Sequence, residues 1–524
     1  MTDALKHFPS PSFRKYQKEV IQKIVKDFES GVDVILLQAP TGFGKSYVNM
    51  ALCSCHSPSY YTTPQLVLLD QVENDANLEG CMKVIRGRSN YPCIYEGGST
   101  CADGPCIRKE EFECPLRGAC EYTIKRGEAS VSRVVSTTLA YYITAVTQHK
   151  EVSFPPHGVM FGHRKLVVID EGHGLEDWIR KFFSLTVSNI EKKSDMTWDD
   201  VLVYVDEATK KAIERLSELH NKHILGLTVD EASEMDRVEK LVQKLNFFKA
   251  DYKKHKNWIF EYKLYSGKDD IGRIELKPIM IDKYGGIVWS KGDKFIISSA
   301  TILHPKLFVR SLGLEDRKWS LIDVPSSFPP ENNRIVDASV GRMSFKNKNE
   351  LMPRAIKVLN EILTREAGKR GIIHCQSYDN ARSVMDDVEP FHKKRLMTHY
   401  SDNRGDQVEE WIRAGPDAVF VSVNMTEGLD LKDDIARFQV ILKCPFPNLS
   451  DPMTKARMSM SDGQTWYDIK TIITIIQASG RATRHKDDYS TLYILDENVI
   501  RVIDKCNRFI PDWFMKSWNK RVTE

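Results

Sequence analysis

The segment APTGFGKS, at residues 39–46, has the residue types and spacing of a phosphate-binding loop. It follows the apolar run DVILLQAP and leads into KSYVNMALCS, which reads as a helix. In that context backbone amides wrap a β-phosphate, Lys45 reaches the β- and γ-oxygens, and the Ser46 hydroxyl binds Mg²⁺. Ala39 replaces the first glycine of the usual pattern. The segment predicts a nucleoside triphosphate site made of Thr41, Gly42, Phe43, Gly44, Lys45 and Ser46.

Two carboxylates follow a second apolar run, in the sequence VVIDEGHG at residues 167–174. Asp170, at the end of the expected strand, can hold the Mg²⁺ shell. Glu171 can polarise the attacking water, since hydrolysis needs a base beside the γ-phosphate. Combined with the phosphate loop, the pair predicts an enzyme that hydrolyses a nucleoside triphosphate.

The sequence QASGRATRHKDD, at residues 477–488, supplies positive charge from the second half of the chain. Gln477, Arg481 and Arg484 have the i, i+4, i+7 spacing of one helix face. The two arginines could reach a γ-phosphate bound to another domain and stabilise its developing charge. Read alone, the segment also fits a surface helix with ion pairs.

Five cysteines lie close together, namely Cys93, Cys101, Cys106, Cys114 and Cys120. In a large chain with no secretory signal, such clustering indicates metal binding rather than disulfides. A Zn²⁺ ion and a [4Fe–4S] cluster each take four cysteine ligands, so the spacing does not separate them. Free thiols on a loop are the remaining alternative, although exposed clustered thiols oxidise readily.

The bulk composition is that of an ordinary soluble globular protein, with 41% apolar and 28% charged residues among 524. The net charge is only +3, so a nucleic-acid partner would need a local basic surface. The N-terminal MTDALKHFPS lacks the features of a secretory signal, and no apolar run reaches about 18 residues. We therefore expect an intracellular protein, cytoplasmic or nucleoid-associated, with no membrane partner.

Short apolar runs alternate with helical patterns along the chain, which is typical of α/β proteins with parallel sheets. Seven such runs predict strands at residues 33–40, 165–170, 294–300, 370–375, 417–423, 438–443 and 491–496. They form two groups, which favours two α/β domains. Between the groups, residues 185–263 are highly charged with helical periodicity and predict a helical insertion.

The ordered set TGFGKS, DEGH, SAT, EGLD and QASGRATR resembles a superfamily 2 helicase, and most closely the XPD/DinG-like iron–sulfur DNA helicases. FRKYQKEV, YTTPQLVLLDQ, GRSNYPC, SSFPPENNR and KCPFPNLSDP add to the resemblance. It implies an α/β fold of two RecA-like parallel-sheet motor domains, with a small Cys-rich metal domain and a helical, arch-like insertion in the first. The expected divisions are motor domain 1 at 1–85, 127–184 and 266–325, the Cys-rich domain at 86–126, the insertion at 185–265, and motor domain 2 at 326–524.

The resemblance also implies roles for individual residues. FRKYQ is similar to the family's adenine-recognition element, so Gln17, with Arg14 beside it, would read the base. His173 in DEGH is retained from the usual DEAH, whereas Gly172 departs from it. The residues expected to couple the nucleotide site to the DNA strand are Thr301, Thr426, Glu427, Gly428 and Asp430, and those expected to contact the strand are Thr62 and Thr63.

For the cysteines, the resemblance favours iron–sulfur, because this family carries its cluster between the phosphate loop and the acidic box. The implied ligands of a [4Fe–4S] cluster are Cys93, Cys106, Cys114 and Cys120, with Cys106 preferred over Cys101 and zinc as the alternative metal. Basic residues near the cysteines could contact a phosphate backbone. They are Arg86, Arg88, Arg108, Lys109, Arg117, Lys125 and Arg126.

The expected function is an ATP- and Mg²⁺-dependent DNA helicase that acts as a monomer on single-stranded and forked DNA. The resemblance implies 5′→3′ movement. Two alternatives are an ATP-gated single-strand-binding remodeller that does not unwind, and an RNA helicase.

Overall fold

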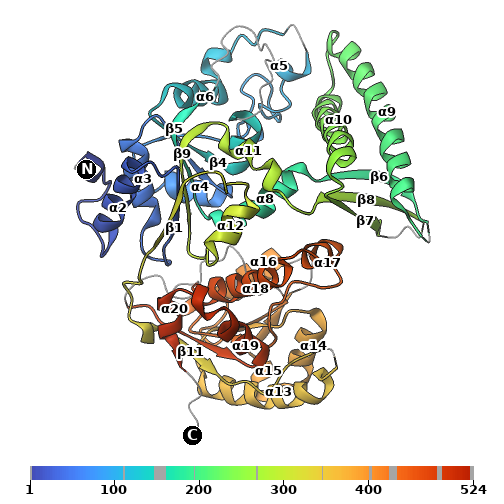
Figure 1. Ribbon diagram of the computed structural model, residues 1–524. Coiled ribbons are helices and arrows are strands. Elements are labelled where there is room, and N and C mark those ends of the chain that lie inside the picture. Colours follow the sequence, from blue (N-terminus) through green and yellow to red (C-terminus); the bar gives the residue numbers. More distant parts are fainter. Residues whose placement is uncertain are drawn as a thin grey trace.

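A computed structural model describes residues 3–109, 112–146, 161–193, 195–266, 270–344, 346–399, 404–423, 433–480 and 487–519. Two parallel β-sheets flanked by helices lie one above the other, and the linking segment runs along one side (Figure 1). This arrangement confirms the predicted α/β fold with two RecA-like domains. Each of the seven predicted strands is present in one of these two sheets.

The first sheet has seven parallel strands in the order β10-β1-β9-β5-β2-β4-β3. Alternate residues of β1 face two cores, because helices cover both faces of the sheet. Ile35 and Leu37 pack toward α2 and α3, while Val34 and Leu36 face α6, α8 and α12. The strands are β1 (Val34–Gln38), β2 (Ser59–Thr63), β3 (Lys83–Ile85), β4 (Val134–Thr138), β5 (Arg164–Ile169), β9 (Gly292–Ser299) and β10 (Trp319–Asp323). The helices are α1 (Asp3–Lys6), α2 (Gln17–Glu29), α3 (Lys45–Cys55), α4 (Leu66–Glu73), α6 (Glu121–Val131), α7 (Leu139–Tyr141), α8 (Leu175–Phe183), α11 (Gly286–Trp289) and α12 (Pro305–Ser311).

The second sheet also has seven strands, in the order β13-β14-β12-β15-β16-β11-β17. They are β11 (Asn333–Asp337), β12 (Gly371–His374), β13 (Leu396–Thr398), β14 (Val419–Ser422), β15 (Phe438–Ile441), β16 (Ser490–Ile494) and β17 (Trp518–Asn519). The helices are α13 (Lys348–Arg365), α14 (Tyr378–Asp387), α15 (Pro390–Lys393), α16 (Arg404–Arg413), α17 (Pro452–Met458), α18 (Gly463–Ser479), α19 (Glu497–Cys506) and α20 (Asp512–Ser517). Of these, α18 faces the first domain (Figure 1).

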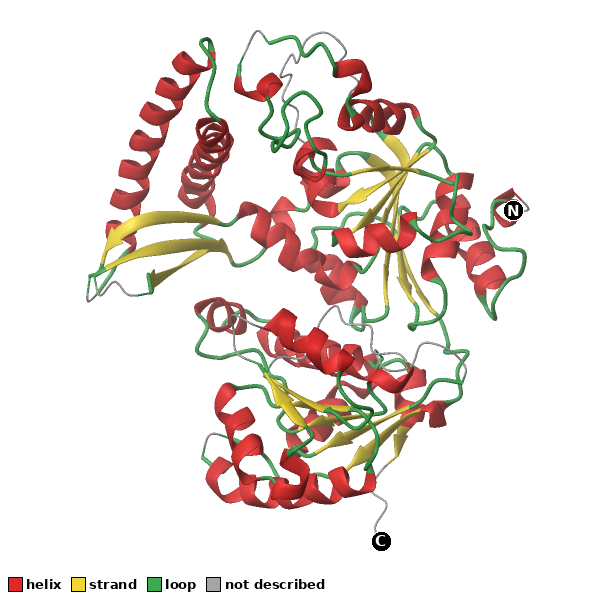
Figure 2. Ribbon diagram, turned by 180° about the vertical axis from the view of Figure 1, so that it is seen from behind, coloured by secondary structure: helices red, strands yellow, loops and turns green. Residues whose placement is uncertain are grey.

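The insertion projects from the first domain as two long antiparallel helices on a small sheet (Figure 2). Helices α9 (Trp198–His223) and α10 (Val229–His255) match the charged segments, and each begins with a capping box, at Thr197 and at Thr228. The sheet, which the sequence did not indicate, is antiparallel in the order β6-β8-β7. Its strands are β6 (Leu185–Glu191), β7 (Trp258–Leu264) and β8 (Ile271–Pro278). Strand β8 begins at Ile271 and pairs with both β6 and β7, so it belongs to the insertion. The insertion therefore extends past the boundary predicted at residue 265.

The tip of the insertion touches the Cys-rich segment. The turn between α9 and α10 meets α5 (Pro105–Arg108), where the Leu227 amide donates to the Arg108 carbonyl at 2.6 Å. His223 Nε2 lies 3.0 Å from the Ile107 carbonyl oxygen. Although the insertion is short for an arch, it reaches the Cys-rich segment and forms backbone contacts with it.

Candidate nucleotide site and Cys-rich segment

The phosphate loop lies between the buried strand β1 and the N-terminus of α3. Gly42 and Gly44 have φ angles of 78° and 84°, in the left-handed region that glycine adopts without strain. The amides at the start of α3 and its helix dipole form a site for anions. Lys45 Nζ donates to the Ala39 carbonyl at 3.2 Å and lies 4.0 Å from Glu171 Oε1, so the loop and the acidic box share one site.

Gln17 and Arg14 hold the phosphate loop from its outer side. Gln17 is fully buried, and its Nε2 donates to the Phe43 carbonyl at 2.8 Å and to the Gly44 carbonyl at 3.4 Å. Arg14 donates through its guanidinium to the Gly42 carbonyl at 2.8 Å. A side chain at position 44 would place its Cβ 2.6 Å from Gln17 Nε2, so glycine is required for this contact. The geometry shows both residues bracing the loop, and the base-reading role stays a prediction.

Asp170 is a partly buried carboxylate just past the carboxyl end of β5. Its Oδ2 accepts from the Tyr61 hydroxyl at 2.6 Å, and its Oδ1 accepts from the Ser298 hydroxyl at 2.9 Å and from the Glu171 amide at 3.0 Å. Burial, followed by the nearby Glu171 carboxylate, raises the pKa of Asp170. The opposing effect comes from Lys45 and from the two hydroxyl donors. Asp170 therefore sits beside the phosphate loop, where a Mg²⁺ ligand is expected.

Glu171 and His173 lie next to each other at the turn after β5. Glu171 has a φ of 49°, a left-handed conformation that is uncommon for residues with a side chain and is concentrated at functional sites. His173 Nδ1 is 3.3 Å from Glu171 Oε2 and 3.0 Å from Ser299 Oγ. The acidic box is thereby joined to the SAT segment at the end of β9.

Gly172 departs from the alanine of the DEAH pattern, and the structure supplies a steric reason. A Cβ at this position would lie 2.2 Å from Cγ2 of Ile297, a fully buried residue of β9. No real Cβ contact is that short, and a branched core side chain cannot move aside without disturbing the packing around it. Gly172 and Ile297 are therefore a complementary pair.

The two domains meet at the phosphate loop. Thr41 Oγ1 donates to the carbonyl of Gly480, just after α18, at 2.9 Å. Gln477, in the last turn of α18, donates through Nε2 to Thr301 Oγ1 at 3.2 Å. Gln477 is thus placed at the domain interface, as expected. Six predicted site residues lie outside the described residues, namely Arg481, Arg484, Thr426, Glu427, Gly428 and Asp430. The prediction that Gln477 and the two arginines share a helix face therefore also concerns positions outside the described residues.

The predicted strand-contacting threonines are buried within the first domain. Thr62 Oγ1 donates to the Val168 carbonyl at 3.1 Å, and Thr63 Oγ1 donates to the Gln65 carbonyl at 3.1 Å. Both side chains are at most 1% exposed. They hold the end of β2 in place, so they cannot reach a strand on the surface in this arrangement.

The five clustered cysteines lie near one another, although they do not form a complete ligand set. Cys101 is buried, with its Sγ 3.6 Å from Cys120 Sγ, whereas Cys106 is exposed. Gly104 leaves room for Cys93, whose Sγ would lie 3.0 Å from a Cβ at that position. Across the described ranges, no three His, Cys, Asp or Glu side chains converge closely enough to hold a metal ion. The thiol chemistry fits a metal that prefers sulfur, and Cys101 and Cys120 already lie at contact distance.

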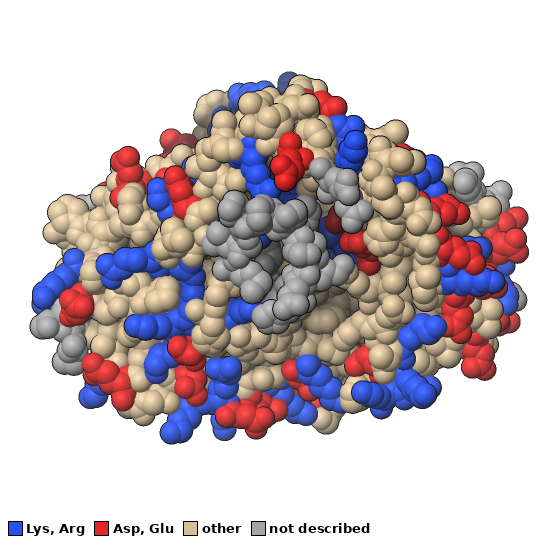
Figure 3. Space-filling model, turned by 90° about the horizontal axis from the view of Figure 1, so that it is seen from above, with Lys and Arg blue, Asp and Glu red and all other residues tan. Residues whose placement is uncertain are grey.

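The basic residues near the cysteines are partly neutralised. Arg86 forms ion pairs with Asp70 and Glu73, and Arg108 forms one with Glu96. Seen from above, lysines and arginines on this face alternate with acidic residues (Figure 3). The basic surface available for a phosphate backbone is therefore smaller than the sequence suggests.

Several site residues were not singled out from the sequence. Tyr61 and Ser298 hold Asp170, and Asn49 donates through Nδ2 to Ser298 Oγ at 2.9 Å. Ser299 connects His173 to Thr301, whose amide donates to Ser299 Oγ at 3.1 Å. The signal was their place in the chain, since Tyr61 lies on β2 opposite Val168 of β5 and both serines lie at the end of β9, beside the carboxyl end of β5.

Comparison with known proteins gives relatives over most of the chain. The family described as "Helicase C-terminal domain" matches residues 361–517, and "Type III restriction enzyme, res subunit" matches residues 10–102. A protein of Haemophilus influenzae named ATP-dependent DNA helicase YoaA is 20% identical, over 89% of this chain and 88% of its own. The ATP-dependent DNA helicase DinG of Photobacterium profundum is 24% identical, over 56% of this chain and 47% of its own.

Solved structures agree with the sequence relatives. An XPD helicase structure has a TM-score of 0.60 at 17% identity, covering 96% of this chain and 99% of its own. The chain is thus similar in sequence to the YoaA and DinG DNA helicases and in fold to XPD helicases. S. tokodaii Xpd4 has a TM-score of 0.56 at 16% identity, covering 97% of this chain and 99% of its own. Along the part of the chain that the structure describes, no helix has the length and apolarity needed to cross a membrane.

The Gly172–Ile297 pair predicts a specific steric coupling. Gly172→Ala should destabilise the protein by about 1–3 kcal/mol, the usual cost of overpacking a core, and should lower ATPase activity. Combined with Ile297→Ala, which removes the clashing Cγ2, it should cost less than the sum of the two single changes. Ile297→Val, which stays branched at Cβ, should give no such relief. Urea unfolding of the three single variants and the two double variants measures the coupling. Strict additivity of Gly172→Ala and Ile297→Ala would contradict it.

The raised pKa of Asp170 predicts an acid limit on hydrolysis that depends on Mg²⁺. As the pH falls through this pKa, the carboxyl takes up a proton and loses its affinity for the metal. ATPase activity at limiting Mg²⁺ should therefore fall at a pH above the ordinary aspartate value of about 3.9, and added Mg²⁺ should move the midpoint to lower pH.

The same shift gives a control for unfolding. A folded-state pKa above the unfolded value means that protonation of Asp170 favours the folded state, so this group adds stability as the pH falls. Circular dichroism should thus show a folded protein at the activity midpoint. A midpoint that does not respond to Mg²⁺ would argue against Asp170 as a metal ligand.

Proposed function

We propose that this helicase uses ATP hydrolysis to move along single-stranded DNA and to separate the strands of a fork. The observation that carries the proposal is the contact between Thr41 of the phosphate loop and Gly480 of the second domain. It brings both domains to one nucleotide site, so that binding and release of ATP can close and open the cleft.

Each residue of the site has a proposed task. Lys45, Ser46 and Asp170 hold the phosphates and the metal, while Glu171 orients the water and His173 orients Glu171. When bound, Mg²⁺ neutralises charge on the β- and γ-phosphate oxygens. We place Gln477, Arg481 and Arg484 opposite the γ-phosphate, and Glu427, Gly428 and Asp430 between the nucleotide and the strand.

DNA as the substrate is supported by the relatives named as DNA helicases, and the resemblance supports 5′→3′ movement. Backbone contacts dominate tracking along a strand, so sequence preference should be weak. We place the splitting of the duplex at the Cys-rich segment. We also propose that the protein acts as a monomer and is nucleoid-associated or cytoplasmic, where its substrate is found.

The function is tested with duplexes that carry a single 5′ or 3′ tail, made of DNA or of RNA. Strand displacement should require ATP and a 5′ DNA tail, and ATPase activity should rise more with DNA than with RNA. Lys45→Ala should abolish hydrolysis and displacement while DNA binding persists, because the lysine belongs to the nucleotide site between the phosphate loop and Glu171. ATPase stimulation with no displacement on any tail would favour a remodeller, and stronger stimulation by RNA would favour an RNA helicase.

We further propose that four of the clustered cysteines bind a metal centre. The resemblance supports a [4Fe–4S] cluster held by Cys93, Cys106, Cys114 and Cys120. Burial of Cys101 and its 3.6 Å distance to Cys120 instead favour Cys101 as the fourth ligand. That distance is close to the edge of a tetrahedral Zn–thiolate site, about 3.8 Å for a Zn–S bond of about 2.3 Å, so zinc stays the alternative.

Metal analysis of serine variants distinguishes iron from zinc, and Cys101 from Cys106 as the fourth ligand. Protein purified without oxygen should contain about four irons per chain and absorb visible light if the centre is a [4Fe–4S] cluster. One of Cys101→Ser and Cys106→Ser should lose most of the metal, and the other should retain it. Cys81→Ser, outside the cluster, is the matched control. A colourless protein with one zinc would replace the iron assignment, and full metal content in both variants would contradict a shared four-thiol site.

A further inference from the structure

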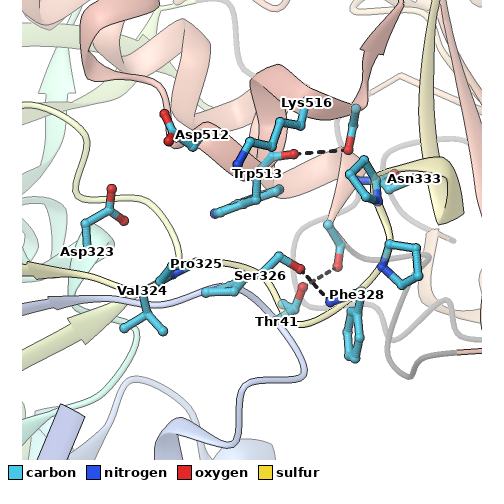
Figure 4. Close-up of a pocket in the computed structure, with 15 residues that line it drawn as sticks. Thr41, Asp323, Val324, Pro325, Ser326, Phe328, Asn333, Asp512, Trp513 and Lys516 are labelled. Atoms are coloured by element: carbon cyan, nitrogen blue, oxygen red, sulfur yellow. Dashed lines mark hydrogen bonds between the residues drawn. The ribbon is translucent and has the colours of Figure 1, made fainter. Parts of the chain in front are cut away.

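A cavity of about 360 Å³ lies between the two domains, directly beside the phosphate loop. Pro40 and Thr41 of that loop form one wall, and Asp323, at the end of β10, lies next to them. The segment that links the domains and helix α20 complete it (Figure 4). Pockets of about 300–1,000 Å³ at domain interfaces are where small ligands usually bind.

Two polar atoms of residues that line the cavity are buried without a hydrogen-bond partner. They are the indole Nε1 of Trp513, a donor, and Oδ1 of Asn333, an acceptor. Buried polar atoms are costly when unpaired, so such atoms usually have a partner in the functional state. The wall of the cavity is therefore incompletely paired, although neither atom is itself open to the cavity.

Charged side chains from both domains also line this cavity. Asp323 Oδ1 accepts from Gln38 Nε2 at 3.1 Å, and its carboxylate points toward α20 (Figure 4). Lys516 and Asp512, on α20, extend over the cavity next to Trp513. The aromatic face suits a flat ring, and the carboxylate suits the hydroxyl groups of an attached sugar.

Gln17, the residue that the resemblance assigns to the base, is already engaged with the phosphate loop. Its side chain is fully buried, its Nε2 bonds two carbonyls of the phosphate loop, and its Oε1 accepts from the Arg14 amide at 2.8 Å. Only the second lone pair of Oε1 is left for a base, so contacts elsewhere must hold most of the nucleoside.

We infer that this cavity receives the base and ribose of the nucleotide whose phosphates bind the phosphate loop, with Trp513 as the stacking face and Asp323 as the acceptor for a ribose hydroxyl. The inference rests on the proposed ATP-driven function and names the residues that recognise the nucleoside. Trp513 belongs to the second domain and Asp323 to the first, so the nucleoside bridges them.

The test separates the nucleoside from the phosphates. Tripolyphosphate carries the phosphate chain alone, so it should engage the phosphate loop and leave the cavity empty. Trp513→Ala should weaken ATP binding by about 5- to 150-fold, the effect of losing one base–aromatic stack, and should leave tripolyphosphate binding unchanged. Trp513→Phe keeps a stacking ring and should bind ATP more tightly than the alanine variant. Calorimetry on the full chain measures each affinity.

Phe391→Ala is the matched control, because Phe391 is an aromatic residue of the second domain that is 76% exposed and far along the chain from the cavity. It should bind both probes as the unmodified protein does. Unchanged ATP binding by Trp513→Ala, or an equal loss for ATP and tripolyphosphate, would overturn the inference. An unmodified protein that binds neither probe would instead refute the ATP-driven function.

The ribose contact has a test of its own. The unmodified protein should prefer ATP over 2′-deoxyATP, and Asp323→Asn should reduce that preference by weakening the acceptor. Asp504→Asn, at an exposed carboxylate on α19, should keep it. A preference for ATP that is the same in all three proteins would remove Asp323 from the ribose site.

Discussion

The partly buried carboxylate of Asp170, held by three hydrogen-bond donors, is the constraint on which the nucleotide site depends. A buried charge is tolerated only when it is fully hydrogen-bonded, and its donors come from the strands on either side of β5. Tyr61 lies on β2 and Ser298 on β9, each in parallel register with β5. A shift of register in either pair would withdraw a donor and leave the charge unpaired. Correct strand pairing and correct placement of the Asp170 carboxylate are therefore the same requirement.

From this point a line of side chains crosses to the second domain. Glu171 contacts His173, His173 contacts Ser299, and Thr301 bonds both Ser299 and Gln477. The links are single hydrogen bonds, each worth about 1 kcal/mol net, so they can exchange partners without unfolding either domain. A change at the γ-phosphate can thus alter how the two domains meet.

The sequence predicted the parts of the fold where one physical cause dominates. Strands buried on both faces are usually apolar throughout, which identified seven of them, and a phosphate loop needs glycine at fixed positions. Strand β2, with the sequence SYYTT, is just as buried but polar in composition, so it and Tyr61 were missed. The pairing of Arg86 with acidic side chains and the burial of Gln17 depend on contacts between distant segments. Such contacts leave no periodic pattern in the chain.

The contact between the insertion and the Cys-rich segment has a topological consequence. From α8 the chain runs through α9 to Leu227, crosses by hydrogen bonds to residues 107–108, and returns to the motor sheet through α6. This is a closed circuit in which every link is covalent except the crossing at the tip. A linear polymer can enter such a circuit by its end, but a polymer without ends can enter only while the crossing is open. Opening it breaks few bonds, so the tip is the weakest point of the circuit.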